Sequence, residues 1–138
     1  MKKEKSCGAV CYKVENDKIY YLLIKQRKGH IAFPKGHVEP GETEEETATR
    51  EIKEETNVDV IIDTNFRMTS TYSPKENVMK DVIIFIGKVI SSNIITQDEE
   101  VAKAMYMTYE DAMESLSYER DKEILKEADV YISEKILK

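Results

Sequence analysis

Several features that mark other classes of protein are scarce or missing in this chain. Its 138 residues include only two cysteines, and no apolar run approaches the length needed to span a bilayer. If residues 5–14 form a strand, Cys7 and Cys11 lie about 13 Å apart on one face, too far for a disulfide bond. They also lack the spacing of metal-ligand pairs. We therefore interpret both as small core residues and expect no membrane span.

Positive charge is also in deficit. Lysine and arginine number 21 against 27 aspartates and glutamates, which gives a net charge of -6 and a pI near 5.1. Such a chain has no general affinity for nucleic-acid phosphates, so a nucleic-acid or membrane partner is not expected. Residues 1–5 lead into no apolar segment of the signal type, which favours the cytoplasm. Without repeats or linkers, residues 1–138 are predicted to form a single domain.

The hydrophobic pattern predicts more strand than helix. Alternating or continuous apolar runs indicate strands over residues 5–14, 19–25, 58–63, 66–72, 78–89 and 102–107. Residues 73–77 are expected to form a loop, and residues 91–100 a polar connection. A short helix is predicted from Thr108 through Met113, and Leu125, Ala128, Ile132 and Ile136 mark one face of a C-terminal helix. The fold class is therefore α+β, a mixed sheet with helices packed on it.

The most unusual stretch is residues 34–58, PKGHVEPGETEEETATREIKEETNV. Positions 42, 44, 45, 46, 51, 54 and 55 are glutamates, and between positions 42 and 55 only Arg50 and Lys53 are basic. Thr43 and Glu46 have the spacing of a capping box, and Asn57 tolerates the left-handed conformation that ends many helices. The second half of the stretch is therefore predicted to be a helix.

Three carboxylates share one face of this predicted helix. Glu51, Glu54 and Glu55 fall within about one third of its circumference, where like charges destabilise a helix by roughly 0.2–0.5 kcal/mol per pair. Three glutamates alone would also suit a solvated acidic face. However, an irregular loop from Gly36 to Gly41 precedes the helix and can bring carbonyl oxygens beside it. Oxygen ligands of both kinds suit a hard divalent cation such as Mg²⁺.

These residues carry a resemblance to a known family. Gly36, five free positions, Glu42, seven free positions and residues 50–58, REIKEETNV, resemble the Nudix box. The one departure is Asn57, where the family has glycine, and it is mild because both residues readily take a positive φ. The resemblance implies an α/β/α sandwich with a mixed sheet. It also implies hydrolysis of a nucleoside diphosphate linked to another group, with Mg²⁺ or Mn²⁺ required.

The resemblance also assigns roles to residues of the box. It implies metal ligation by Glu51, Glu54, Glu55 and the Gly36 carbonyl, and Arg50 would orient Glu54. Glu42 would either hold the loop or reach a second metal. The general base would be Glu54 or Glu100, and Glu99 could replace Glu100 by a shift of one residue.

The residues around the box suggest a substrate. The prefix PKGHVEPGE, residues 34–42, is similar to that of diadenosine tetraphosphate hydrolases of the animal and archaeal type, which release ATP and AMP. Those enzymes carry a tyrosine and lysines just before the strand that follows the box, where this chain has Tyr72, Lys75 and Lys80. An aromatic ring can stack on adenine, and lysines can hold phosphates. Lys35 and His37 flank Gly36 and are also expected near phosphate.

Other functions fit part of this pattern. A Nudix pyrophosphatase could act instead on an oxidised nucleoside triphosphate, a diphosphoinositol polyphosphate or a capped RNA end. A non-catalytic nucleotide-binding module is an alternative of another class, although such a module would be expected to lose glutamates from the box.

Overall fold

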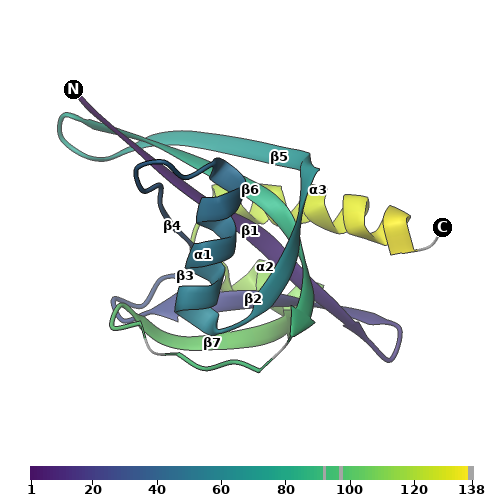
Figure 1. The fold of residues 1–138 in the computed structure, drawn as a ribbon. Coiled ribbons are helices and arrows are strands. Elements are labelled where there is room, and N and C mark those ends of the chain that lie inside the picture. Colours follow the sequence, from purple (N-terminus) through teal and green to yellow (C-terminus); the bar gives the residue numbers. More distant parts are fainter. Residues whose placement is uncertain (92, 97, 137–138) are drawn as a thin grey trace.

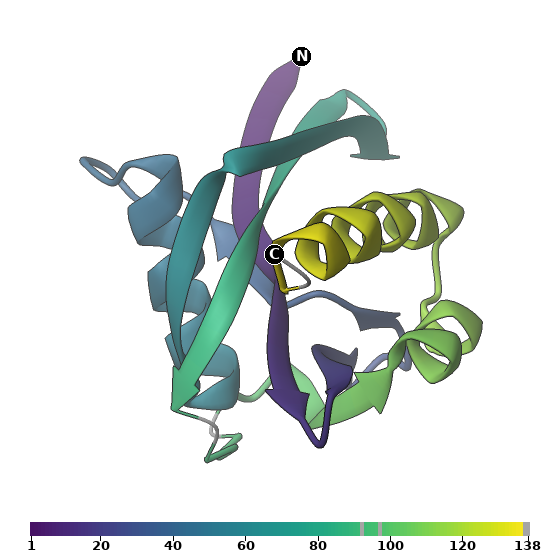
Figure 2. The same cartoon turned by 90° about the vertical axis from the view of Figure 1, so that its right-hand side faces the viewer.

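A mixed β-sheet lies between two layers of helix (Figure 1). The computed structural model describes residues 1–91, 93–96 and 98–136. The elements in chain order are β1 (Lys2–Glu15), β2 (Lys18–Gln26), β3 (Ile31–Ala32), β4 (Lys35–His37), α1 (Glu44–Thr56), β5 (Asp59–Lys75), β6 (Val78–Ser91), β7 (Val101–Thr108), α2 (Tyr109–Ser115) and α3 (Glu119–Ile136). Figure 2 shows α1 on one side of the strands and α3 on the other, which confirms the predicted α/β/α sandwich.

Strand β1 is the centre of the sheet. It runs parallel to β6 along most of its length, and β5 pairs antiparallel with the far side of β6. On its other side β1 is shared by two partners, since residues 11–15 pair with β2 and residues 6–8 pair with β4. Because side chains alternate along a strand, Cys7 and Cys11 face α1, whereas Val10 and Tyr12 face α3.

The helix predicted from the acidic stretch forms as α1. Thr43 and Glu46 make both bonds of the capping box, and Asn57 ends the helix in the left-handed conformation with φ of 65°. Its apolar face is small, but Ala48 and Ile52 are completely buried against the sheet. Both cysteines are also buried and free, as expected.

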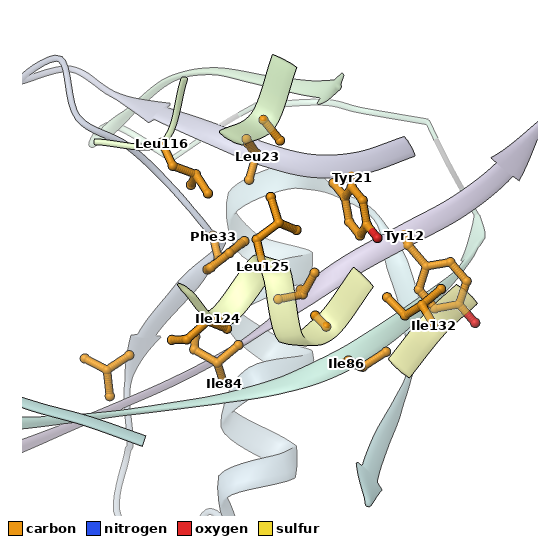
Figure 3. Close-up of a cluster of buried hydrophobic side chains, with 14 residues drawn as sticks. Tyr12, Tyr21, Leu23, Phe33, Ile84, Ile86, Leu116, Ile124, Leu125 and Ile132 are labelled. Atoms are coloured by element: carbon orange, nitrogen blue, oxygen red, sulfur yellow. The ribbon is translucent and has the colours of Figure 1, made fainter. Parts of the chain in front are cut away.

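The opposite face of the sheet carries the larger apolar cluster (Figure 3). Ile124, Leu125 and Ile132 of α3 pack over Ile84 and Ile86 of β6. Of the four residues predicted to mark one face of α3, Leu125, Ala128 and Ile132 are buried, whereas Ile136 is not. Its side chain is 42% exposed because it lies in the last turn of α3, beside the exposed Val14 at the end of the sheet.

The pattern of apolar residues missed some features of the strands. Segments 58–63 and 66–72 belong to one strand, β5, whose pairing with β6 shifts between Asp63 and Met68. This shift interrupts the alternation of side chains and explains the apparent gap. The loop expected over residues 73–77 shrinks to a turn at residues 76–77, because β5 continues to Lys75.

Two short strands, β3 and β4, were not predicted, and β4 overlaps the start of the irregular loop expected from Gly36 to Gly41. Neither is long enough to show a hydrophobic period, and pairing with β2 and β1 creates both of them. Residues 92 and 97 of the connection predicted over 91–100 lie outside the described part of the chain. Among the described residues, no helix combines the length and apolar character needed to cross a bilayer.

Candidate active site

A polar cleft of about 590 Å³ opens beside α1 and β4. The residues that line it are Ser6, Gln26, Lys35, Gly36, His37, Glu39, Glu51, Glu54, Glu55, Lys80, Asp98, Glu99 and Glu100. The structure thus brings most of the predicted site residues together from four segments, which are β4, α1, β6 and the residues just before β7. Tyr72 and Lys75 do not line this cleft.

The alternation of side chains along β4 divides the cleft in two. Gly36 pairs with Cys7, which faces α1, while Lys35 pairs with Gly8 and therefore faces the opposite side of the sheet. Gly36 lies so close to α1 that an added Cβ atom would sit 1.9 Å from Oε2 of Glu51. Only glycine lets the backbone of β4 approach this carboxylate so closely.

Arg50 ties the acidic residues to the loop before the helix. Its guanidinium donates two hydrogen bonds to the Glu42 carboxylate, at 2.6 and 2.9 Å, and one to the Glu51 carboxylate at 2.5 Å. It also donates to the His37 carbonyl oxygen at 2.9 Å and to Glu54 at 3.2 Å. The Arg50 hydrogen bonds lower the pKa of Glu42 to about 2. These contacts hold the loop against α1.

Two of the α1 carboxylates are withdrawn from water. Glu55 is 8% exposed, and its Oε1 accepts a hydrogen bond from the Lys35 backbone N–H at 2.9 Å. Burial and the neighbouring Glu51 charge raise the pKa of Glu55 to about 8. Burial also raises the pKa of Glu51, although Arg50 opposes that shift. Glu54 is more exposed, and its carboxylate contacts Arg50 alone among the described residues.

This set of donors fits a hard divalent cation. Glu55 is buried and Glu51 is half-buried, and a cation would relieve the repulsion between their charges. Backbone oxygen is close by at Gly36. As the side chains stand, no three His, Cys, Asp or Glu groups in the described segments are gathered closely enough to hold one ion. Arg50 donates to Oε1 of Glu51 and the Lys35 N–H donates to Oε1 of Glu55, so the second oxygen of each carboxylate is left for an ion.

Lysine side chains line the part of the cleft on the side of the sheet that α3 covers. Burial lowers the pKa of both Lys35 and Lys80, and neither forms an ion pair with any residue that the structure describes. His37 lies near them, with its Nε2 3.9 Å from the Glu4 carboxylate. Two unpaired ammonium groups in a partly buried cleft are suited to an anionic ligand.

An aromatic group extends beyond these lysines. The guanidinium of Arg120 lies between two tyrosine rings, 4.0 Å from the centroid of Tyr72 and 4.3 Å from that of Tyr118. The Tyr118 ring in turn stands 5.4 Å from the ring of His30. Lys75 is exposed at the turn between β5 and β6. Sequence reasoning missed Tyr118 and Arg120, which stand at the start of α3 and belong to no motif.

The acidic triplet before β7 forms a further edge of the cleft. Glu99 and Glu100 are fixed by their backbone, since Arg27 Nε donates to the Glu99 carbonyl at 2.6 Å and the Arg27 N–H donates to the Glu100 carbonyl at 2.9 Å. Asp98, which was not predicted as a site residue, lies near α1, and its charge helps to raise the pKa of both Glu51 and Glu55. Its signal in the sequence was only its place in the triplet.

Comparisons with known proteins relate this chain to a family. The NUDIX domain model matches residues 5–128. The asymmetrical bis(5'-nucleosyl)-tetraphosphatase of Mus musculus is 29% identical over 140 residues, which cover 93% of this chain and 95% of that protein. A Caenorhabditis elegans Ap4A hydrolase, solved as a binary complex, matches with a TM-score of 0.85 at 27% identity over 94% of this chain and 98% of that one.

A more distant structure shares the fold alone. The NUDIX domain of Shewanella oneidensis NrtR, complexed with ADP ribose, matches with a TM-score of 0.81 at 14% identity, over 96% of this chain and 90% of that one. The family match, by contrast, rests on the sequence itself and leaves only the two ends of the chain outside it. The chain therefore belongs to the Nudix family and is a hydrolase.

Proposed function

We propose that this protein hydrolyses diadenosine tetraphosphate asymmetrically, to ATP and AMP, with Mg²⁺ or Mn²⁺. The observation that carries the proposal is the composition of one cleft, which is lined both by carboxylates of α1 and by the lysines of β4 and β6. A polyphosphate requires both kinds of group, because its own negative charge repels an attacking water. The relatives named as tetraphosphatases cover nearly the whole chain, which favours this substrate over others.

The α1 side of the cleft would hold the cation. Nudix hydrolases generally use divalent metal ions. We assign ligation to Glu51, Glu54, Glu55 and the Gly36 carbonyl, with Arg50 orienting Glu54 by a charge-assisted hydrogen bond. When bound, the ion would neutralise phosphate charge and make a bound water more acidic.

The opposite side of the cleft would hold the phosphate chain and an adenine ring of the substrate. Lys35, Lys80 and His37 stand where they can pair with phosphate oxygens that the cation leaves uncovered. Beyond them, Tyr72 and Tyr118 flank a planar guanidinium, so the two rings are spaced for a flat group between them. An adenine ring stacked in this position would be stabilised by about 1–3 kcal/mol. Lys75 could reach only a phosphate near the hairpin end.

The reaction adds one water across a phosphoric anhydride. The water oxygen bonds to phosphorus, the bridging P–O bond breaks, and the leaving phosphate departs as part of ATP or AMP. The proton of the water passes to a carboxylate, for which Glu54 and Glu100 are the candidates, with Glu99 next to the latter. All three line the cleft. Asp98 joins them as a candidate, because its charge acts on the same α1 carboxylates.

A substrate panel with product identification tests this proposal. The protein would be incubated with Mg²⁺ and diadenosine tetraphosphate, an oxidised nucleoside triphosphate, a diphosphoinositol polyphosphate or a capped RNA. We expect AMP and ATP in equal amounts from the first, at the highest kcat/KM. Two ADP molecules, or preference for another substrate, would overturn the assignment. Binding of nucleotide without turnover of any substrate would favour the non-catalytic alternative.

A further inference from the structure

Ser6 is a buried polar residue at the cleft that no step above uses. Its side chain is 1% exposed, and its Oγ has no hydrogen-bond partner within the described residues. The same residue lines the cleft. A buried hydroxyl without a partner destabilises the folded chain, and such groups are rare enough that each needs an explanation.

The register of β1 shows which groups Ser6 faces. Ser6 pairs with His37 of β4 on one side and with Val82 of β6 on the other. Val82 belongs to the apolar cluster under α3, so the Ser6 side chain is on the same face of the sheet. Lys80 lies two residues before Val82 and Lys35 two residues before His37, so both lysines lie on this face as well. Ser6 is therefore between the two lysines.

The alternation of β1 also separates Ser6 from the carboxylates. The next residue, Cys7, faces α1 and pairs with Gly36, which lies against Glu51. A group bound by the Ser6 hydroxyl is therefore on the side of the cations and not among the proposed metal ligands.

We propose that Ser6 Oγ donates a hydrogen bond to a phosphate oxygen of the bound substrate. This proposal rests on the proposed function, which places a polyphosphate between Lys35 and Lys80. The hydroxyl is already shielded from water in the free protein. Donating a hydrogen bond to a charged oxygen therefore costs the hydroxyl no further desolvation, once the lysine side chains beside it turn to admit the phosphate. The unfavourable free energy of the unpaired hydroxyl is relieved only when the substrate binds.

The chain offers a matched control. Tyr106 carries the other buried oxygen without a partner among the described residues, and it does not line the cleft. Its ring lies under the Lys13 ammonium group, 3.9 Å from the ring centroid, on the side of the sheet that faces α1. Tyr106→Phe and Ser6→Ala each remove one unpaired hydroxyl and leave the rest of the side chain in place.

The two variants should differ in activity but not in stability. We expect Ser6→Ala to lower kcat/KM about tenfold, mainly through KM, while its thermal midpoint stays the same or rises by about 2–4 °C. Tyr106→Phe should show the same change of midpoint with kcat/KM unchanged. A loss of activity that comes with a lower midpoint in Ser6→Ala would mean that the residue is structural, and unchanged kcat/KM would overturn the proposal.

Binding measurements separate phosphate from metal. Methylenediphosphonate, a base-free and non-hydrolysable probe, would be titrated calorimetrically with Mg²⁺ present, and Mn²⁺ alone would be titrated by electron paramagnetic resonance. Ser6→Ala should bind the diphosphonate about tenfold more weakly and Mn²⁺ equally well. Weaker Mn²⁺ binding, or equal diphosphonate binding, would contradict the assignment.

The same measurements distinguish a failure of Ser6 from a failure of the proposed function. If the wild-type protein releases no AMP and ATP from the dinucleotide, the proposed substrate is wrong, yet the diphosphonate titration still reports on Ser6. If the wild-type protein cleaves the dinucleotide and Ser6→Ala matches it, the proposal for Ser6 alone fails.

Discussion

The two faces of the sheet bring opposite charges to the same cleft. On one side of the sheet, helix α1 contributes the carboxylates of Glu51 and Glu55, and on the side that α3 covers, β4 and β6 contribute Lys35 and Lys80. Strand β4 joins the two, because Gly36 faces α1 while its neighbours face the other way. Three consecutive residues of β4, Lys35, Gly36 and His37, can therefore contribute to both the metal half and the phosphate half of the site.

The two halves also differ in how their charges are compensated. The carboxylates beside α1 share one strong partner, Arg50, whose guanidinium contacts Glu42, Glu51 and Glu54. The lysines form no ion pair among the described residues. The carboxylate half and the lysine half of the cleft therefore differ in their charge balance. Single substitutions can disable one half while leaving the other intact.

The largest effect is expected from Glu54→Gln. Removing this carboxylate takes away a proposed metal ligand and candidate base, so kcat should fall about a thousandfold or more. Its side chain is 53% exposed, so the fold should be unaffected. Steady-state kinetics would be compared with Glu45→Gln, which makes the same charge change in the exposed first turn of α1. Equal rates for the two variants would mean that the metal face has been misassigned.

Gly36→Ala should damage the α1 half alone. The added methyl group would meet the Glu51 carboxylate and force it to turn, because Oε2 stands only 1.9 Å from the new Cβ position. We expect affinity for Mn²⁺ to fall about 10–100-fold, as for other changes that misorient a ligand. Diphosphonate affinity measured without metal should be unaffected. Unchanged Mn²⁺ binding would contradict the ligand role proposed for Glu51.

Lys80→Ala should damage the other half alone. Loss of one ammonium group beside phosphate should raise KM about tenfold and leave Mn²⁺ affinity unchanged. Lys88→Ala is the matched control, since Lys88 is an exposed lysine on the same strand, away from the cleft. Kinetics that are the same for both variants would contradict the role given to Lys80.

The smallest effect concerns how α1 is attached to the sheet rather than what it binds. Arg67 donates two hydrogen bonds of 2.9 Å to Glu44, which also pairs with Lys5, and Arg67 is the main cause that lowers the pKa of Glu44 to about 2. Arg67→Ala should reduce the free energy of unfolding at pH 7 by less than about 1 kcal/mol, because the pair is partly exposed. Activity should not change.

The difference in free energy of unfolding between wild type and Arg67→Ala should depend on pH in a defined direction. The folded pKa of Glu44 is depressed below its ordinary 4.5, so the stabilisation is complete above that pH and is lost as the pH falls towards 2. Urea unfolding at pH 7 and at successively lower pH would check it. A difference between wild type and Arg67→Ala that grows on acidification would be inconsistent with this ion pair.

Local signals in the sequence were enough for α1 and its ends. The capping box, the left-handed Asn57 and the carboxylates on one helical face depend on residues three or four positions apart, and all are found in the structure. The strands were found where the apolar alternation is unbroken. The shift of register between β5 and β6 and the short strands β3 and β4 were missed, because pairing with distant residues creates these features.

The same division holds for the candidate site. Glu51, Glu54, Glu55 and Arg50 lie within six positions, so a fixed spacing could identify them. Tyr118, Arg120 and Asp98 have no such spacing to the box and reach its neighbourhood only through the fold. Ser6 is an ordinary strand residue in the sequence, and its lack of a partner becomes visible only once its neighbours are in place.

The amino-acid sequence by itself determined the acidic helix, its caps, the predominance of strands over helices and the family. These features follow from periodicity and short-range spacing. Only the tertiary structure decided which residues face the cleft. A strand's two faces are set by its partners, so the register of β1 with β4 and β6 directs Lys35 and Ser6 to one side and Gly36 to the other.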